Sequence, residues 1–359
     1  MSKLAVIFTL AITAGQLIRF PFGPGSINLL DLFITGFVIF HLLKLKFKLK
    51  KPPAFIMGAI LFGLIAILSL TFSPLKLTLP QILVSFSYIA RFLFYIMFAW
   101  ISFNLPPLRL AGVALAVLGL LQIIILPDLS FLTILGWDPH YFRLVSTFLD
   151  PNFTGAFLVL TLLLLPRPSL WFWVVYLALL LTFSRSSYGM FLISFSTLAW
   201  LQKSLKLQII TLALFAGLMS GFFLYTLAVS QPRNIDRAES ASLRLNTWQQ
   251  GWQIFEKHPL LGVGFNAYRF ALAEFDLGGE QFLKSHGSSG NDASLLFVLA
   301  TTGILGLASF MFFLYLLIRK GGLVTAAVTG LLFHSLFANS LFFPPILLWL
   351  ILISSSPKK

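Results

Sequence analysis

Apolar runs long enough to cross a bilayer recur along nearly the whole chain. A membrane-spanning helix needs about 20 mainly apolar residues. Such runs, several of them short, fall at roughly residues 4–20, 26–43, 54–73, 80–103, 107–126, 152–165, 168–183, 187–202, 207–229, 292–318, 322–340 and 343–355. The 359 residues are 58% hydrophobic and 10% charged, and the mean hydropathy of +0.94 is far above that of a soluble globular protein. The sequence therefore predicts an all-α polytopic membrane protein of about twelve helices, within a range of about ten to thirteen.

The charges of the loops predict an orientation, because short cytoplasmic loops carry an excess of lysine and arginine. With a cytoplasmic N-terminus, every acidic residue falls at or near the external face, and the net charge of +14 arises largely inside. The inside cations are Lys3, Lys44, Lys46, Lys48, Lys50, Lys51, Arg109, Arg167, Lys203, Lys206, Arg319, Lys320, Lys358 and Lys359. We therefore expect both termini in the cytoplasm. The basic balance indicates topology and contact with anionic lipid head groups, not nucleic acid.

Two longer segments interrupt the single membrane domain expected over residues 1–359, and both are predicted to lie outside the cytoplasm. The shorter external loop covers residues 127–151 and the longer one residues 230–291. Long loops in compact proteins are usually functional or disordered. In the longer loop Leu245, Trp248, Trp252 and Phe255 recur at spacings of three and four, which predicts an amphipathic helix along the membrane surface. A glycine-permitted turn is expected after this helix.

Five stretches in the C-terminal two thirds resemble motifs of the O-antigen ligase and O-antigen polymerase superfamily of membrane glycosyltransferases. They are, in order, RLVSTFLDPNFTG, LTFSRSSYG, LRLNTWQQGWQIFEKHPLLGVGFNAY, ASLLFVLATTGILGL and HSLFANSLFFPP. The resemblance lies in their order, in the topology and in the long loop before the tenth helix, a GT-C-like arrangement. It defines a ligase-related region over residues 140–310.

This resemblance implies a metal-independent transfer of a glycan, without a cofactor, from a polyprenyl diphosphate to an acceptor hydroxyl. The reaction would take place at the outer face of the bacterial cytoplasmic (inner) membrane. Attack on the anomeric carbon opposite the leaving group would invert its configuration. The expected partners are the lipid-linked donor, a lipid or glycan acceptor and membrane lipids.

Three alternatives to a ligase stay open. A polymerase would join lipid-linked repeat units with the same residues and differ only in its acceptor. A transporter of lipid-linked sugars also needs arginines in a cavity, although transporters commonly show internal repeats and broken midplane helices. An inactive scaffold is the third.

Arginines are the residues that suit a diphosphate leaving group. Charge develops on its oxygens in the transition state, and a guanidinium can bind these oxygens through two parallel hydrogen bonds. The resemblance assigns diphosphate binding to Arg185 and Arg244, with Arg143 and Arg91 in support. Arg185 could instead extend from a helix end towards the interface, and Arg244 could face lipid phosphates. The external or embedded arginines are Arg19, Arg91, Arg143, Arg185, Arg233, Arg237, Arg244 and Arg269.

Two of these arginines have acidic residues as alternative partners. Arg143 could pair with Asp138 or Asp150. Asp150, which a proline follows, is expected mainly to cap the sixth helix. Arg91 lies within an apolar run, where a charge costs at least about 2.5 kcal/mol. We therefore expect it to point into the helix bundle, towards Asp31, another partner or the substrate cavity.

The general base is where the sequence departs from the ligase pattern. That pattern has a His-Asn pair about eleven and ten residues before the glycine at position 303, where this chain has Asp292 and Ala293. Asp292 could accept the acceptor's proton if burial raises its pKa, or it could cap a helix. His286 could serve from a glycine-flanked loop, or it could be solvated. His334 is expected to be a packed intramembrane histidine, with a site-facing role as the alternative.

Overall fold

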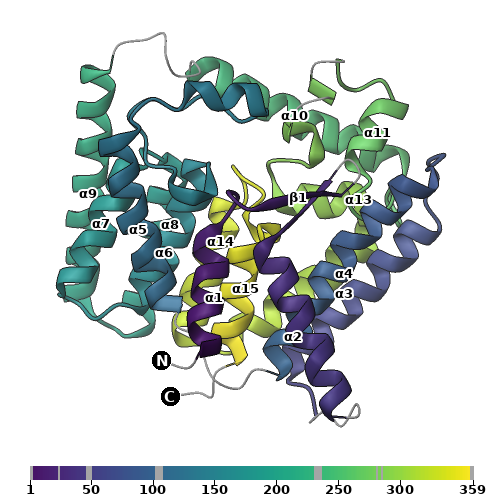
Figure 1. The fold of residues 1–359 in the computed structure, drawn as a ribbon, viewed down its shortest axis with the longest axis horizontal. Coiled ribbons are helices and arrows are strands. Elements are labelled where there is room, and N and C mark those ends of the chain that lie inside the picture. Colours follow the sequence, from purple (N-terminus) through teal and green to yellow (C-terminus); the bar gives the residue numbers. More distant parts are fainter. Residues whose placement is uncertain are drawn as a thin grey trace. The chain divides into compact units, whose positions relative to one another are not determined.

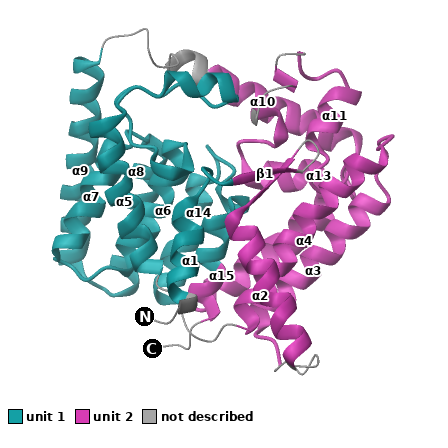
Figure 2. Ribbon diagram, viewed as in Figure 1, with its two compact units in different colours: residues 1–18, 106–241, 321–350 teal, residues 19–105, 242–320, 351–359 magenta. Residues whose placement is uncertain are grey.

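The computed structural model describes residues 3–22, 25–45, 51–101, 108–229, 237–279, 282–283 and 286–355. The chain divides into two compact units, each assembled from segments distant in the sequence (Figure 2). The first unit comprises residues 1–18, 106–241 and 321–350, and the second comprises residues 19–105, 242–320 and 351–359. Both are built mainly from helices (Figure 1).

Helix α6 (Pro151–Leu164) lies at the centre of the first unit. It is apolar around most of its circumference and almost entirely buried, as expected of a helix with no polar face. It contacts α5 (Leu108–Ile125), α7 (Leu170–Leu181), α8 (Arg185–Leu201) and α14 (Gly322–His334). Helix α8 also packs against α14 and α9 (Leu205–Ala228). The unit further contains α1 (Lys3–Ala14), most of α15 (Pro344–Ser355) and the 3₁₀ turns η1 (Ser130–Leu135), η2 (Ser146–Phe148) and η4 (Ser340–Phe342).

The helix starts in this unit follow from local capping. Asp150 Oδ1 accepts hydrogen bonds from the backbone N–H groups of Asn152 and Phe153, at 2.6 and 2.9 Å, and Pro151 takes the first helical position. Serine caps the next three helices in the same way, at Ser169, Ser184 and Ser204. The predicted capping role of Asp150 is thus confirmed.

The second unit contains a short β-hairpin and five longer helices. Strands β1 (Arg19–Phe22) and β2 (Gly25–Asn28) pair antiparallel, with Phe20 opposite Ile27. Helix α4 (Leu79–Ile101) packs against α2 (Leu29–Leu45) and α3 (Ala54–Thr71), and α3 packs along α13 (Ser294–Ile318). Most of α10 (Arg237–Lys257) belongs to this unit, together with α11 (Tyr268–Glu274) and the turn η3 (His286–Ser289). The sequence had predicted helices here and no hairpin.

Helix α13 is broken at Gly303, which has φ 64° and ψ −165°. The break exposes backbone groups, and the glycine turn that follows α10 satisfies them. Ile304 donates its backbone N–H to Pro259 O at 2.8 Å, and Gly264 donates to Thr301 O at 2.9 Å. The predicted turn is confirmed. Within the apolar run at 292–318 the helix is interrupted at Gly303, where these tertiary hydrogen bonds replace helical ones.

Five helical segments within the described residues are long and apolar enough to cross a membrane. They are α3, α4, α5, α9 and the segment Gly287–Ile318, which includes α13. Five apolar helices are shorter: Ala5–Ala14, Pro151–Leu164, Leu170–Leu181, Gly322–His334 and Pro344–Ser355. This composition fits a polytopic helical membrane protein. The number of twelve spans stays a prediction, as does the external position of the loop at 230–291, whose residues 230–236 lie outside the described part.

Candidate functional site

The candidate residues divide between the two units. Arg143 and Arg185 lie in the first, and Arg91, Arg244, His286 and Asp292 lie in the second. The structure thus places each candidate among the neighbours of its own unit. Three local arrangements result: the first turn of α8, the junction of α10 with α13, and an ion pair between α2 and α4.

Arg185 is the first residue of α8 and its side chain is exposed. Its Cζ atom lies 5.8 Å from the centre of the Phe222 ring on α9. The preceding residue, Ser184, caps the helix by accepting the backbone N–H of Ser187 at 3.3 Å. The unpaired N–H groups and the dipole of a helix N-terminus favour anions, and the guanidinium adds a full positive charge. This end of α8 is therefore chemically suited to a phosphate group.

Hydrogen bonds from three serine hydroxyls to Asn152 connect this turn to the start of α6. Ser184 Oγ and Ser186 Oγ donate to Asn152 Oδ1 at 2.8 and 3.3 Å, and Ser187 Oγ donates to the Asn152 carbonyl oxygen at 3.1 Å. The Asp150 cap in turn holds the backbone of Asn152. The serines beside Arg185 therefore make hydrogen bonds within the protein, while Arg185 itself is exposed.

Arg143 holds the chain just before α8. Its Nε donates to Thr182 O at 3.1 Å and its Nη2 to Phe183 O at 3.4 Å. Phe183 has a φ of 48°, a left-handed conformation that a non-glycine residue adopts at some cost. These hydrogen bonds stabilise the turn that leads to Arg185. A role of Arg143 in diphosphate binding stays a prediction.

His140, which the sequence reasoning did not single out, lies close by. Its side chain is buried, and neither ring nitrogen has a hydrogen-bond partner among the described residues. Burial and, as a smaller contribution, the charge of Arg143 together lower the pKa of His140 to about 3. The imidazole is therefore neutral at physiological pH.

In the second unit, the half-buried Arg244 and Asp292 meet through Thr247, one turn along α10. The Thr247 hydroxyl lies 2.9 Å from Arg244 O and 3.4 Å from Asp292 Oδ2. The buried Asn291 donates to Thr247 O and also lies 3.0 Å from the Tyr268 hydroxyl, so it joins α10 and α11 to the segment before α13. The backbone of Arg244 and the side chain of Asp292 thus lie on either side of the Thr247 hydroxyl, where α10 meets the segment before α13. We therefore include this junction in the candidate site.

The N-cap alternative for Asp292 does not hold. The N-cap residue of α13 is Ala293, whose side chain makes no capping hydrogen bond. Asn291 Oδ1 instead accepts the Ala293 N–H at 2.9 Å. The backbone of His286 begins η3, whereas its side chain lies outside the part of the structure that is described. Among the described residues, no cluster of three His, Cys, Asp or Glu side chains is placed to bind a metal ion.

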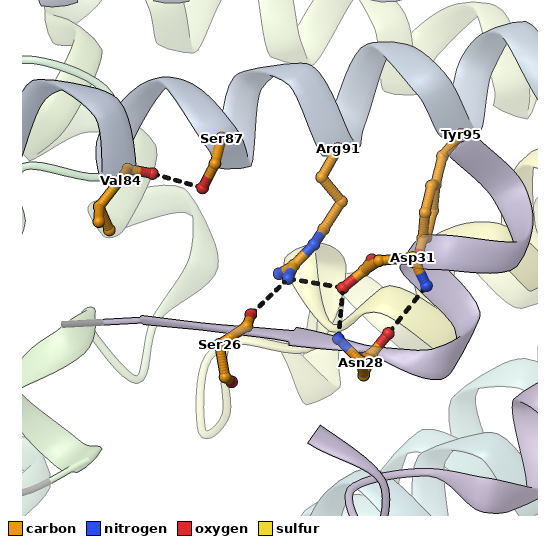
Figure 3. A network of polar contacts seen from close by, with 7 residues as sticks. All are labelled: Ser26, Asn28, Asp31, Val84, Ser87, Arg91 and Tyr95. Carbon is orange, nitrogen blue, oxygen red and sulfur yellow. Dashed lines mark hydrogen bonds and ion pairs between the residues drawn. The ribbon is translucent and has the colours of Figure 1, made fainter. Parts of the chain in front are cut away.

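Arg91 forms an ion pair with Asp31 (Figure 3). Its Nη2 lies 2.7 Å from Asp31 Oδ2 and donates to Ser26 O at 3.0 Å, and the Tyr95 hydroxyl donates to Asp31 Oδ1 at 2.7 Å. Asn28 and Asp31 also exchange backbone-to-side-chain hydrogen bonds, as in a capping box at the start of α2. Of the alternatives for Arg91, the pairing with Asp31 is therefore confirmed. Its contact with a diphosphate stays a prediction.

Comparison with protein families identifies the region that holds most of these residues. Residues 170–311 match the family model described as O-antigen ligase. This match supports the resemblance of the chain to the O-antigen ligase and polymerase superfamily. The matched O-antigen ligase segment begins at the first residue of α7, ends within α13 and includes Arg185, Arg244 and Asp292. A comparison with curated proteins finds no match for the chain.

The match to the O-antigen ligase model supports ligase- or polymerase-type activity on lipid-linked glycans at a membrane. Several residues that organise this ligase segment were missed from the sequence. Asn152 follows the Asp-Pro pair that starts α6, and Thr247, Tyr268 and Asn291 are common residue types with no motif of their own. Only Asn291 could have been found from the sequence, because it directly precedes the candidate base Asp292.

Proposed function

We propose that this protein transfers a glycan from a polyprenyl diphosphate donor to an acceptor hydroxyl at the outer face of the cytoplasmic membrane. The observation that carries the proposal is the exposed guanidinium of Arg185 at the N-terminus of α8, within the matched ligase segment. Hydroxyl groups and Asn152 hold this turn, so little rearrangement is needed before an anion binds.

In this mechanism Arg185 and Arg244 bind the diphosphate of the donor. The bond between the anomeric carbon and the diphosphate oxygen breaks, and the leaving group keeps the electron pair. The two guanidinium groups stabilise the charge that develops on its oxygens. Arg143 supports Arg185 through the carbonyl groups of Thr182 and Phe183.

The acceptor oxygen attacks the anomeric carbon from the opposite side and inverts its configuration. Its proton passes to a general base, for which we propose Asp292, with His286 as the alternative. The contact of Asp292 with the Thr247 hydroxyl, next to Arg244, supports this assignment. A carboxylate can accept a hydroxyl proton in a positioned complex.

The family match fits a polymerase equally well, and the two activities differ in the acceptor. A lipid-linked sugar transporter is a second candidate because the break of α13 at Gly303 resembles the discontinuous helices of transporters. A transporter would move the donor without cleaving it, so release of polyprenyl diphosphate separates the two classes.

The test uses the full-length protein in liposomes with a polyprenyl diphosphate glycan and candidate acceptors. Wild-type protein should release polyprenyl diphosphate and form a glycosylated product, and the acceptor that is consumed distinguishes ligase from polymerase. Arg185→Ala should lower the turnover rate by about 10²- to 10³-fold, as loss of a group that stabilises developing negative charge does. Arg109→Ala, which changes an exposed arginine of α5, is the matched control. Unchanged turnover in Arg185→Ala would refute the donor site, and unchanged turnover in Asp292→Ala would refute that base.

A further inference from the structure

His334, the last residue of α14, is fully buried among hydroxyl groups. Its Nε2 lies 3.3 Å from both Ser186 Oγ and Ser187 Oγ, and its Nδ1 lies 3.1 Å from Ser340 Oγ. Burying a polar ring in an apolar helical bundle is unfavourable unless hydrogen bonds compensate. This histidine is therefore held by specific contacts, and the residues that it contacts lie beside Arg185.

The hydrogen bonds around His334 fit a tautomer in which Nδ1 is the donor and Nε2 the acceptor. Ser340 Oγ can donate its proton to Ala338 O, at 3.2 Å, so that it accepts from Nδ1–H. Nε2 is then the acceptor of a neutral imidazole. Ser187 can donate to Asn152 O at 3.1 Å, and Ser184 can donate to Asn152 Oδ1 at 2.8 Å. The single proton of the Ser186 hydroxyl can therefore be donated to Nε2, at 3.3 Å, in place of Asn152 Oδ1.

The first turn of α8 is thus held from two sides. Asn152 at the start of α6 accepts hydrogen bonds from the Ser184 and Ser187 hydroxyls, and His334 at the end of α14 contacts Ser186 and Ser187. Ser186 and Ser187 directly follow Arg185, so their positions fix the backbone that carries the exposed guanidinium.

We propose that His334 is a positioning residue for Arg185. Its neutral imidazole, oriented by Ser340, holds the serines so that the guanidinium presents its donors to the diphosphate of the lipid-linked substrate. This proposal rests on the proposed function, because it requires that Arg185 binds the donor. It extends the site to a residue outside the matched segment 170–311.

The test measures kcat and the donor KM of the full-length protein in liposomes with a polyprenyl diphosphate glycan. His334→Ala should raise the donor KM about tenfold, since it removes the partner of the serines and leaves their hydroxyl groups buried. His334→Gln places an amide near the position of Nε2 and should restore the KM to within about threefold of wild type. Ser186→Ala, a small change that should preserve folding, should shift the KM in the same direction as His334→Ala.

Thr329→Val is the matched control. Thr329 of α14 also contacts α8, with its hydroxyl 3.1 Å from that of Thr197, but away from Arg185. This variant should keep the wild-type KM, which separates loss of helix packing from loss of positioning.

A double variant separates this inference from the proposed function. Adding His334→Ala to Arg185→Ala should cause no further loss of turnover, because the histidine acts through the arginine. If Arg185→Ala is inactive while His334→Ala and Ser186→Ala keep the wild-type KM, the inference is wrong and the donor site stands. If Arg185→Ala is fully active, the proposed function itself fails.

Discussion

The ion pair between Arg91 and Asp31 allows a prediction that separates a structural role from donor binding. The two side chains are 15% and 8% exposed, so each charge is largely removed from solvent. Arg91→Met would keep the length of the side chain but leave the Asp31 carboxylate without its cation. Tyr95 and the Asn28 N–H would remain as its hydrogen-bond donors. Removal of one partner from a buried pair destabilises a protein by about 3–5 kcal/mol.

The paired change Asp31→Asn with Arg91→Met removes both charges together. Since no unpaired charge remains, most of the lost stability should return. Unfolding in detergent, followed by tryptophan fluorescence, measures the stability of each variant, and donor turnover is measured on the same preparations. Arg109→Met, at an exposed position of α5, is the control for loss of a positive charge.

The two roles predict different outcomes for the paired variant. If Arg91 serves mainly Asp31, the paired variant is stable and active. If Arg91 contacts the diphosphate, it is stable but impaired in turnover. Our reasoning about the ion pair would be refuted if Arg91→Met unfolded like wild type, or if the paired variant were no more stable than Arg91→Met.

Two further predictions concern stability. Gly303→Ala should destabilise the protein by at least about 1–3 kcal/mol, because the backbone conformation of Gly303 is almost exclusive to glycine and a Cβ would lie 2.2 Å from Leu260 O. The control is Gly36→Ala, which should not destabilise the protein because a Cβ there would meet no atom within 4 Å. Equal unfolding midpoints of the two variants would contradict the account. The lowered pKa of His140 means that the folded protein binds fewer protons than the unfolded chain, so stability should fall as pH decreases from about 6.5 towards about 3, by at most about 1.4 kcal/mol per pH unit. In His140→Phe this part of the pH dependence should disappear, and an unchanged pH profile would show that the histidine titrates normally.

Local signals in the sequence predicted several features correctly. The Asp-Pro pair at 150–151 indicates a helix start, and the glycines at 262 and 264 indicate a turn. Both features can be predicted because a helix cap and a turn depend only on neighbouring backbone groups. A helix is also present where one was predicted, as α10, while its position along the membrane surface stays a prediction. Its Leu245 and Trp252 are exposed, whereas the side that packs in the protein carries Thr247, Gly251 and Ile254.

Features that depend on partners distant in the sequence could not be predicted. The hairpin at residues 19–28 is too short to show a strand period, and its second strand leads directly into α2. Arg91 and Asp31 are 60 positions apart, so the sequence left several partners open. The contact between His334 and Ser186 joins residues 148 positions apart, and only the packing of α14 on α8 brings them together.

The most direct test of the account is the release of polyprenyl diphosphate by the purified full-length protein, measured together with the glycan transferred to acceptor. The account predicts one polyprenyl diphosphate released for each bond formed, with an inverted anomeric configuration and with release lost in Arg185→Ala but retained in Arg109→Ala. Transport of intact donor without release, or equal release by wild type and Arg185→Ala, would contradict it.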